Sequence, residues 1–187
     1  MASTALPFLF SAQLIGNEYY GDCCLRMTAP LSPAIHLGAD RILVIGNRDE
    51  SPVSVPTEPG DYPSMGELGG YMLDTIFMDT LMADLSRLKR INRTLSLIPE
   101  SQRHQTQLKP IQTLVIKPSV DVREITKAHA PAIPGPVKTL LKMIGGWGKD
   151  WRMPSYLLFE PSYTRALIEM GHQDAMNQKD EIKEFLS

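Results

Sequence analysis

Short apolar runs separated by polar turns fill the first part of the chain. Residues 7–15 form an apolar, strand-like segment that ends at residues 16–17, a Gly-Asn dipeptide typical of a turn. Residues 41–46 form a second run, rich in branched side chains, as expected for a strand that is buried on both faces. Between these runs, residues 31–39 predict a short helix with Ser32 as its N-cap. The order of strand, turn, helix and strand indicates an α/β unit.

The pattern becomes helical after residue 63. Between residues 64 and 97 an apolar residue recurs every three or four positions, which predicts a helix with one apolar face towards the core. Ser64 and Glu67 have the spacing of a capping box at its start. Gly69 and Gly70 would let a neighbouring backbone approach this helix closely.

Strand and helix signals continue in the last third of the chain. Residues 111–116 predict a third strand, and residues 136–144 and 174–186 predict helices. Asp121 and Glu124 have capping spacing, so helix capping explains the Asp121 carboxylate better than a catalytic role does. We therefore predict an α/β fold with an open sheet of about three strands, flanking helices and a largely helical C-terminal half.

Two smaller features of the last third have a structural interpretation. His129 falls at the end of the helix that Asp121 opens, and no serine or cysteine lies near it in sequence, so we interpret it as a surface or capping residue. Trp147 and Trp151 are expected to pack on the domain, because a pair of exposed tryptophans is a liability in a soluble protein.

Composition places the chain among ordinary globular proteins. Its 187 residues are 43% hydrophobic and 21% charged, with a formal net charge of −2, which argues against a general nucleic-acid binder. No apolar stretch reaches the roughly 18 residues that indicate a membrane span. The sequence therefore predicts neither a nucleic-acid partner nor a transmembrane segment.

The cysteine and histidine content bears on compartment and metals. Cys23 and Cys24 are adjacent and are the only cysteines, so they provide no disulfide framework. A reducing, cytoplasmic compartment is the resulting expectation. The four histidines and two cysteines show no metal-ligand spacing, and we expect neither a metal nor a cofactor.

Several segments resemble one enzyme family. They are YYGDCCLRMTAPLSPAIHLGADRILVIG at 19–46, YPSMGELGGYMLDTIFMDTL at 62–81, IQTLVIKPSVDVREI at 111–125 and SYLLFEPSYTRALIEMGHQDAM at 155–176. In these segments the chain is similar, nearly end to end, to the C-terminal part of bacterial patatin-like phospholipases. The resemblance implies a lipid acyl hydrolase that acts on lipid or acyl-ester substrates with a Ser-Asp dyad. In such enzymes the serine lies in a G-x-S-x-G elbow, and an upstream Gly-rich loop forms the oxyanion hole.

Asp22 is the one position to which the resemblance carries a catalytic role. The family's aspartate lies in a D-G-G or D-G-A turn and acts as the base of the dyad. Here Cys23 and Cys24 follow Asp22, where a glycine and a small residue are expected. Glycine adopts a positive φ at little cost and cysteine does not, so this turn departs from the family's pattern.

The nucleophile of the family is absent from this sequence. No G-x-S-x-G occurs, and the nearest imitation, residues 62–66, lacks the first glycine. Two interpretations stay open. In one, the chain is a fragment of a lipid acyl hydrolase that a missing N-terminal half or a second chain completes. In the other, it is a non-catalytic remnant that acts as a protein-interaction module. Under both, the chain alone is expected not to hydrolyse esters.

The resemblance also implies how the chain is organised. Residues 1–62 correspond to the C-terminal portion of the catalytic domain, with the aspartate turn and a Pro-rich loop, and residues 63–187 correspond to a helical extension packed on it. Because the central strands of the sheet would lie outside this chain, we expect an apolar strand edge without a neighbour. Such an edge predicts self-association unless a partner covers it.

Overall fold

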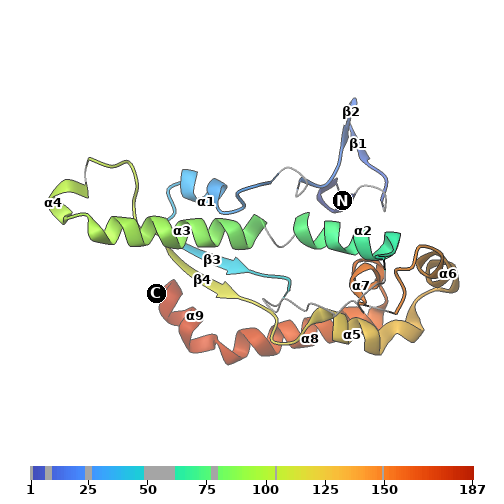
Figure 1. The fold of residues 1–187 in the computed structure, drawn as a ribbon. Helices are drawn as coiled ribbons and strands as arrows, with labels where there is room; N and C mark the ends of the chain where they lie inside the picture. Colours follow the sequence, from blue (N-terminus) through green and yellow to red (C-terminus); the bar gives the residue numbers. More distant parts are fainter. Residues whose placement is uncertain are drawn as a thin grey trace. The chain divides into compact units, whose positions relative to one another are not determined.

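The computed structural model describes residues 2–6, 10–23, 27–48, 62–76, 80–103, 105–148 and 150–187. These residues form a mixed α/β structure in which helices predominate, as the sequence predicts (Figure 1). Most of the Pro-rich loop, residues 49–61, lies outside the described residues.

The chain divides into two compact units, and each is assembled from two separate stretches. Unit 1 contains Met1–Asp40 and Asp74–Ile111, and unit 2 contains Arg41–Leu73 and Gln112–Ser187. These boundaries differ from the division at residue 62. That division follows family resemblance and stays a prediction.

Unit 1 combines a β-hairpin with helices. Its elements are a 3₁₀ turn at Ala2–Thr4, β1 at Gln13–Ile15, β2 at Glu18–Tyr20, α1 at Ser32–His36, α3 at Thr80–Leu97 and α4 at Glu100–Arg103. β1 and β2 pair antiparallel, and Gly16 in the turn between them has a φ of +65°. The predicted turn is therefore confirmed, and residues 7–9 of the predicted strand lie outside the described residues.

The start of α1 differs from the prediction. Leu31 is the N-cap residue, in a helical conformation and without a side-chain cap, so the assignment of Ser32 as the cap is wrong. Leu31 is buried, and its N–H donates to the Asp84 carboxylate at 3.0 Å. Because the Asp84 side chain binds this amide, the N-cap of α1 is Leu31, one residue before the predicted cap Ser32.

Unit 2 contains the parallel strand pair. β3 at Arg41–Ile45 pairs with β4 at Gln112–Ile116, in register from Arg41 opposite Gln112 to Ile45 opposite Ile116, which confirms both predicted strands (Figure 1). The described strands thus form two sheets of two strands each. The expected single sheet of about three strands is not observed, because β1 pairs with its neighbour in sequence.

Helices make up the rest of unit 2. They are α2 at Met65–Asp74 (its last residue, Asp74, belongs to unit 1), α5 at Val122–His129, a 3₁₀ turn at Ala130–Ala132, α6 at Gly135–Met143, α7 at Arg152–Leu157, α8 at Pro161–Asn177 and α9 at Lys179–Leu186. The helix predicted over residues 64–97 is described as α2 and α3, and residues 77–79 between them are outside the described residues. The last helix begins at Lys179, later than predicted, because α8 continues to Asn177.

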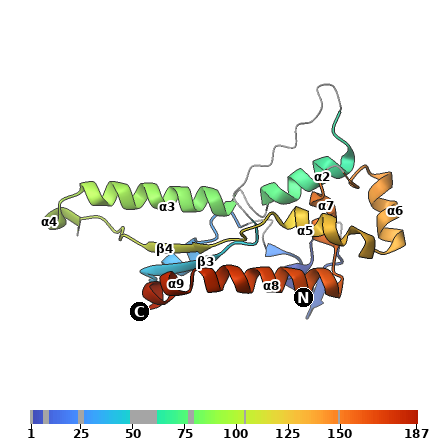
Figure 2. The same ribbon diagram turned by 90° about the horizontal axis from the view of Figure 1, so that it is seen from below.

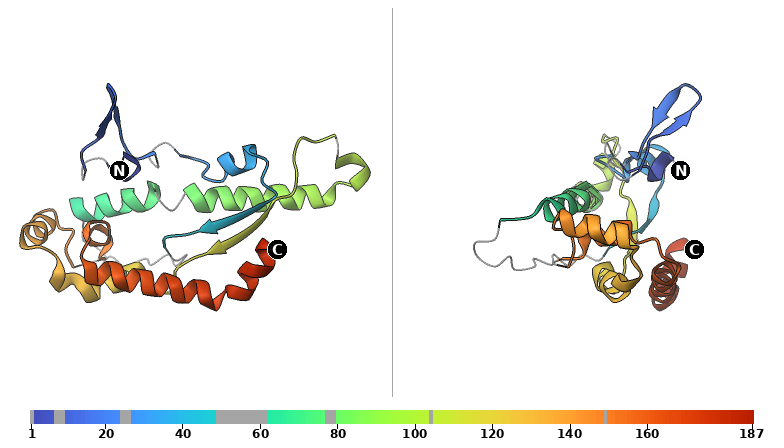
Figure 3. Two further views of the ribbon diagram at one scale, coloured as in Figure 1. Left: turned by 180° about the vertical axis from the view of Figure 1, so that it is seen from behind. Right: turned by 90° about the vertical axis from the view of Figure 1, so that its right-hand side faces the viewer.

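The core of unit 2 lies where α5 and α8 run side by side, as Figure 3 shows. Val122, Ile133, Leu158 and Tyr163 form its buried centre, and Trp147 packs against them. The Trp147 and Trp151 rings meet edge to face with centroids 5.2 Å apart. This arrangement confirms the expectation that the tryptophans pack on the domain.

The backbone of α2 touches the loop that follows α6. The Gly66 N–H donates to the Ile144 carbonyl at 2.7 Å, and a Cβ at Gly66 would overlap the backbone of Gly146. At Gly69 the neighbour is the Met153 side chain, and at Gly70 the neighbours are the Arg152 side chain and, at 3.6 Å, the Met153 backbone nitrogen. A close approach at these glycines is therefore confirmed, but the closest backbone contact is one turn earlier, at Gly66.

Candidate functional site

Asp22 lies two residues after the hairpin. Its N–H donates to the carbonyl of Ala5, a buried residue, at 3.2 Å. The Asp22 residue itself is half-buried, and Cys23 beside it is exposed, with a free thiol. The segment after β2 therefore holds Asp22 at a defined backbone position and leaves it partly open to solvent.

The turn at Cys23 differs from a glycine turn. Among the described residues, Trp151 is the only non-glycine with a positive φ, so Cys23 does not occupy the left-handed region. Cys24 lies outside the described residues. The chain thus accommodates cysteine at this position through a different backbone conformation from the one that glycine favours.

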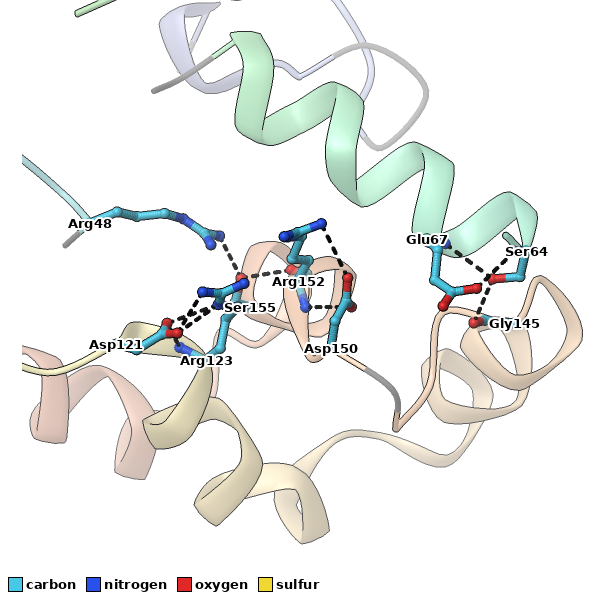
Figure 4. A network of polar contacts seen from close by, with 9 residues as sticks. All are labelled: Arg48, Ser64, Glu67, Asp121, Arg123, Gly145, Asp150, Arg152 and Ser155. Atoms are coloured by element: carbon cyan, nitrogen blue, oxygen red, sulfur yellow. Dashed lines mark hydrogen bonds and ion pairs between the residues drawn. The ribbon is translucent and has the colours of Figure 1, made fainter. Parts of the chain in front are cut away.

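Ser64 is a helix cap, as the sequence predicts (Figure 4). Its N–H donates to Glu67 Oε2 at 2.8 Å, and its Oγ accepts the Glu67 N–H at 3.2 Å. The hydroxyl proton is donated to the Gly145 carbonyl at 2.9 Å. Ser64 therefore stabilises α2 and joins it to the loop after α6, which is a structural role.

Asp121 is also a helix cap, and the structure adds an ion pair that the sequence analysis missed. Asp121 Oδ1 accepts the backbone N–H of Arg123 at 2.8 Å, and Asp121 Oδ2 lies 2.7 Å from Arg123 Nη2. Burial alone would raise the pKa of Asp121. The hydrogen bonds and charge of Arg123, with the charge of Arg48, outweigh it and hold this pKa below its ordinary value.

The same two-residue spacing recurs at the start of α7. Asp150 Oδ1 accepts the backbone N–H of Arg152 at 3.1 Å, and Asp150 Oδ2 lies 3.5 Å from Arg152 Nη1. The Arg152 guanidinium also lies over the Tyr71 ring of α2, 3.8 Å from its centroid. The repeated Asp-x-Arg spacing at two helix starts is the sequence signal that could have indicated these pairs.

Arg48 and Ser155 complete the polar network drawn in Figure 4. Arg48 Nη2 donates to Ser155 Oγ at 2.7 Å, and the Arg48 guanidinium lies over the Tyr156 ring. Ser155 Oγ in turn donates to the Arg152 carbonyl at 2.6 Å. The Ser155 proton thus goes to a backbone carbonyl, which gives Ser155 a structural role, and these contacts link the segment after β3 to α7.

His129 lies in the last turn of α5, as predicted. Its Nδ1 is 2.9 Å from the Ile125 carbonyl, and its ring meets Tyr163 edge to face. Asp22 belongs to unit 1, whereas Ser64, Asp121 and His129 belong to unit 2. The candidate residues of the sequence thus sort into one candidate catalytic carboxylate and three structural residues.

Within the described ranges, no three histidine, cysteine, aspartate or glutamate residues are grouped so that they could hold a metal ion. The described helices include none whose length and apolar character would suffice to cross a membrane.

Comparison with protein-family models, with curated proteins and with solved structures finds no match to this chain. A catalytic role for Asp22 therefore stays a prediction from the sequence segments that resemble the patatin-like enzymes.

Proposed function

We propose that this chain is the aspartate-bearing part of a patatin-like lipid acyl hydrolase, with Asp22 as the base of a Ser-Asp dyad. The observation that carries this proposal is the segment 19–46, in which the aspartate follows a glycine and an aromatic pair and precedes a short helix and an apolar strand. The presence of α1 and β3 in that order, and the parallel pairing of β3 with β4, support a partial α/β sheet of the kind proposed.

In this mechanism Asp22 accepts the proton of a serine that a segment outside this chain supplies. The serine oxygen attacks the carbonyl carbon of an acyl ester, and the leaving oxygen takes the proton from Asp22 and departs as the alcohol. Water, giving a proton to Asp22, then attacks the acyl-serine, and the carboxylic acid leaves as the proton returns to the serine oxygen. The transfer requires the carboxylate to lie about 2.6–3.2 Å from the serine oxygen. Asp22 is half-buried, so part of the residue is exposed to solvent.

The same mechanism predicts that the chain alone is inactive. The oxyanion donors would come from the Gly-rich loop, which this sequence lacks, and losing even one such donor costs about 10²–10³ in kcat. A p-nitrophenyl ester should therefore be hydrolysed at the background rate by the chain and by Asp22→Ala alike. Turnover that Asp22→Ala removes would contradict this expectation.

A direct test uses the DNA upstream of this reading frame. We expect a G-x-S-x-G elbow and a Gly-rich loop, in frame or one frameshift away. The joined protein should then hydrolyse a p-nitrophenyl ester, and Asp22→Asn should lower kcat by about 10²–10⁴, the usual contribution of a general base. Asp180→Asn, at an exposed position of α9, is the matched control and should leave kcat unchanged.

One observation favours a second function, a non-catalytic interaction module. Cys23 stands at the glycine position, and its backbone is not left-handed. A turn of different conformation is tolerable if the orientation of the Asp22 carboxylate is not needed for catalysis. If no upstream elbow exists, or if the joined protein stays inactive with Asp22 intact, this second function replaces the first.

A further inference from the structure

A groove of about 400 Å³ follows one face of α3 in unit 1. Its lining includes Arg87 and Arg90 at one end of the face and Ile91, Leu95, Ile98 and Leu108 towards the other. Residues 87 and 98 are separated by about 16 Å along the helix axis, at about 1.5 Å per residue. The groove is therefore an elongated site with a cationic end and an apolar end.

The connector after α4 returns along α3, as Figure 2 shows, and its residues Thr106 and Leu108 belong to the lining of the groove. Hydrogen bonds fix its shape. Arg103 Nε donates to the Ile98 carbonyl at 3.1 Å, and Thr106 Oγ1 lies 3.0 Å from the Arg103 carbonyl. At its far end Ile111 is bonded through both backbone polar groups to the Asn92 side chain. Because the connector is held at both ends, the groove is formed before any ligand binds, and binding costs less ordering.

At the cationic end, the positive charges of Arg87 and Arg90 are only partly neutralised by the Asp84 carboxylate. In the described part of the chain, the Arg90 side chain makes no hydrogen bond or ion pair. Arg87 lies 3.3 Å from Asp84 Oδ1, yet 55% of its side chain stays exposed. Asp84 also accepts the Leu31 N–H, so one buried carboxylate serves two donors and leaves Arg90 uncompensated.

The apolar end is lined by the branched side chains of Ile91, Leu95, Ile98 and Leu108, and the only hydroxyls in the described lining belong to Thr94 and Thr106. The Thr94 hydroxyl donates to the Arg90 carbonyl at 3.0 Å, and Thr106 Oγ1 also lies 3.3 Å from the Leu108 carbonyl. Both hydroxyls in the lining thus have partners in the chain. A ligand gains contact with Ile91, Leu95 and Ile98 at this end by removing apolar surface from water.

We infer that this groove binds a single-chain amphiphile with a carboxylate head, whose head pairs with Arg87 and Arg90 and whose tail lies along Ile91, Ile98 and Leu108. Guanidinium groups bind carboxylates through two parallel hydrogen bonds, and the volume falls in the usual range of ligand sites. Two turns of an amphipathic helix, about 10 Å wide and about 11 Å long, would fill roughly 850 Å³, about twice this groove. The inference rests on the groove alone and is independent of the proposed hydrolase.

The test is a calorimetric titration of the full chain with sodium decanoate below its micelle concentration. We expect one decanoate per chain. Arg90→Ala should weaken binding about tenfold, the loss typical of one charge-assisted hydrogen bond, and decanol should bind similarly weakly. Leu108→Asn should weaken binding as well, because it places an amide in the apolar end.

Matched variants on the same helix separate this site from general effects. Arg93→Ala and Leu97→Asn change exposed residues of α3 that do not line the groove, and both should bind decanoate as the unchanged chain does. No decanoate binding, equal binding of decanoate and decanol, or equal losses in the groove and control variants would each overturn the inference.

Discussion

Asn92 and Ile111 exchange two hydrogen bonds, although 19 positions separate them in sequence. Asn92 Nδ2 donates to the Ile111 carbonyl at 2.7 Å, and Asn92 Oδ1 accepts the Ile111 N–H at 3.1 Å. The side-chain amide takes the place of a neighbouring strand for the residue that precedes β4. Only 3% of Ile111 is exposed, so water does not replace these bonds.

Asn92→Ala should lower the free energy of unfolding by about 2 kcal/mol, because it leaves a buried N–H and a buried carbonyl without partners. Urea denaturation followed by circular dichroism measures this change. Asn177→Ala is the control, since it removes an exposed side-chain bond to Gln173, and it should change stability by less than about 0.5 kcal/mol. Equal losses of unfolding free energy in both variants would show that the Asn92–Ile111 hydrogen bonds stabilise the protein no more than an exposed side-chain bond does.

Gly66→Ala and Gly171→Ala should have opposite effects. A Cβ at Gly66 would overlap the backbone of Gly146, which cannot move aside as a flexible side chain would. At Gly171 in α8, no atom of the described residues beyond the neighbouring helix backbone lies within 4 Å of such a Cβ. Alanine is favoured over glycine within a helix, so Gly171→Ala should stabilise the protein by about 0.5–1 kcal/mol. Gly66→Ala should lower the melting temperature, and a rise in both variants would contradict the close backbone contact.

Asp121→Asn should reduce stability at neutral pH and flatten its dependence on pH in acid. The folded pKa of Asp121 is lowered, so the carboxylate contributes stability above its unfolded pKa, near 3.8, and loses it as the pH falls through the folded pKa. The variant also leaves the buried Arg123 guanidinium without this partner, at a cost of about 3 kcal/mol.

Denaturation curves between pH 7 and pH 2.5 provide the measurement for Asp121. Asp180→Asn, at an exposed carboxylate on α9, is the control and should follow the unchanged chain. If Asp121→Asn keeps the full acid sensitivity of the unchanged chain, other carboxylates cause it.

Local signals predicted the elements of this fold well. β3 and β4 fall within the apolar runs predicted at 41–46 and 111–116, and Ser64 and Asp121 cap helices as predicted. These signals are reliable because the residues that form a strand or a capping box are neighbours in sequence. Ser32 failed as a cap because Asp84, far along the chain, holds the Leu31 amide. Long-range partners of this kind are not visible in a local pattern.

The candidate site was predictable only in part. The family resemblance singles out Asp22, but the Asp121–Arg123 and Asp150–Arg152 pairs depend on how arginine side chains fold back at two helix starts. β1 pairs with β2 and not with β3 or β4. The hydrophobic pattern of residues 13–15 would suit a strand in either sheet, so it does not predict which strand β1 pairs with.

Self-association should depend on β3. Among the described strands, β3 pairs with β4 on one side only, and Ile45 at its end is 77% exposed. An apolar strand without a second neighbour pairs readily with another chain, and a lysine discourages such pairing. Ile45→Lys should therefore shift size-exclusion profiles towards the monomer, while Ile168→Lys, at an exposed position of α8, should not. A monomeric unchanged chain would contradict this prediction.

The interleaving of the two units has a consequence for synthesis on the ribosome. Synthesis runs from the N-terminal side to the C-terminal side, so unit 1 can close only after Ile111 has emerged. The first stretch of unit 2, Arg41–Leu73, has emerged before then. Unit 2 closes only after α9 has emerged, because the Phe185 carbonyl accepts a hydrogen bond from Arg41 at 2.8 Å. Cleavage at one peptide bond cannot separate the two units, because each contains two stretches of the chain. A nascent chain that stalls before α9 lacks the hydrogen bond between Arg41 of β3 and Phe185.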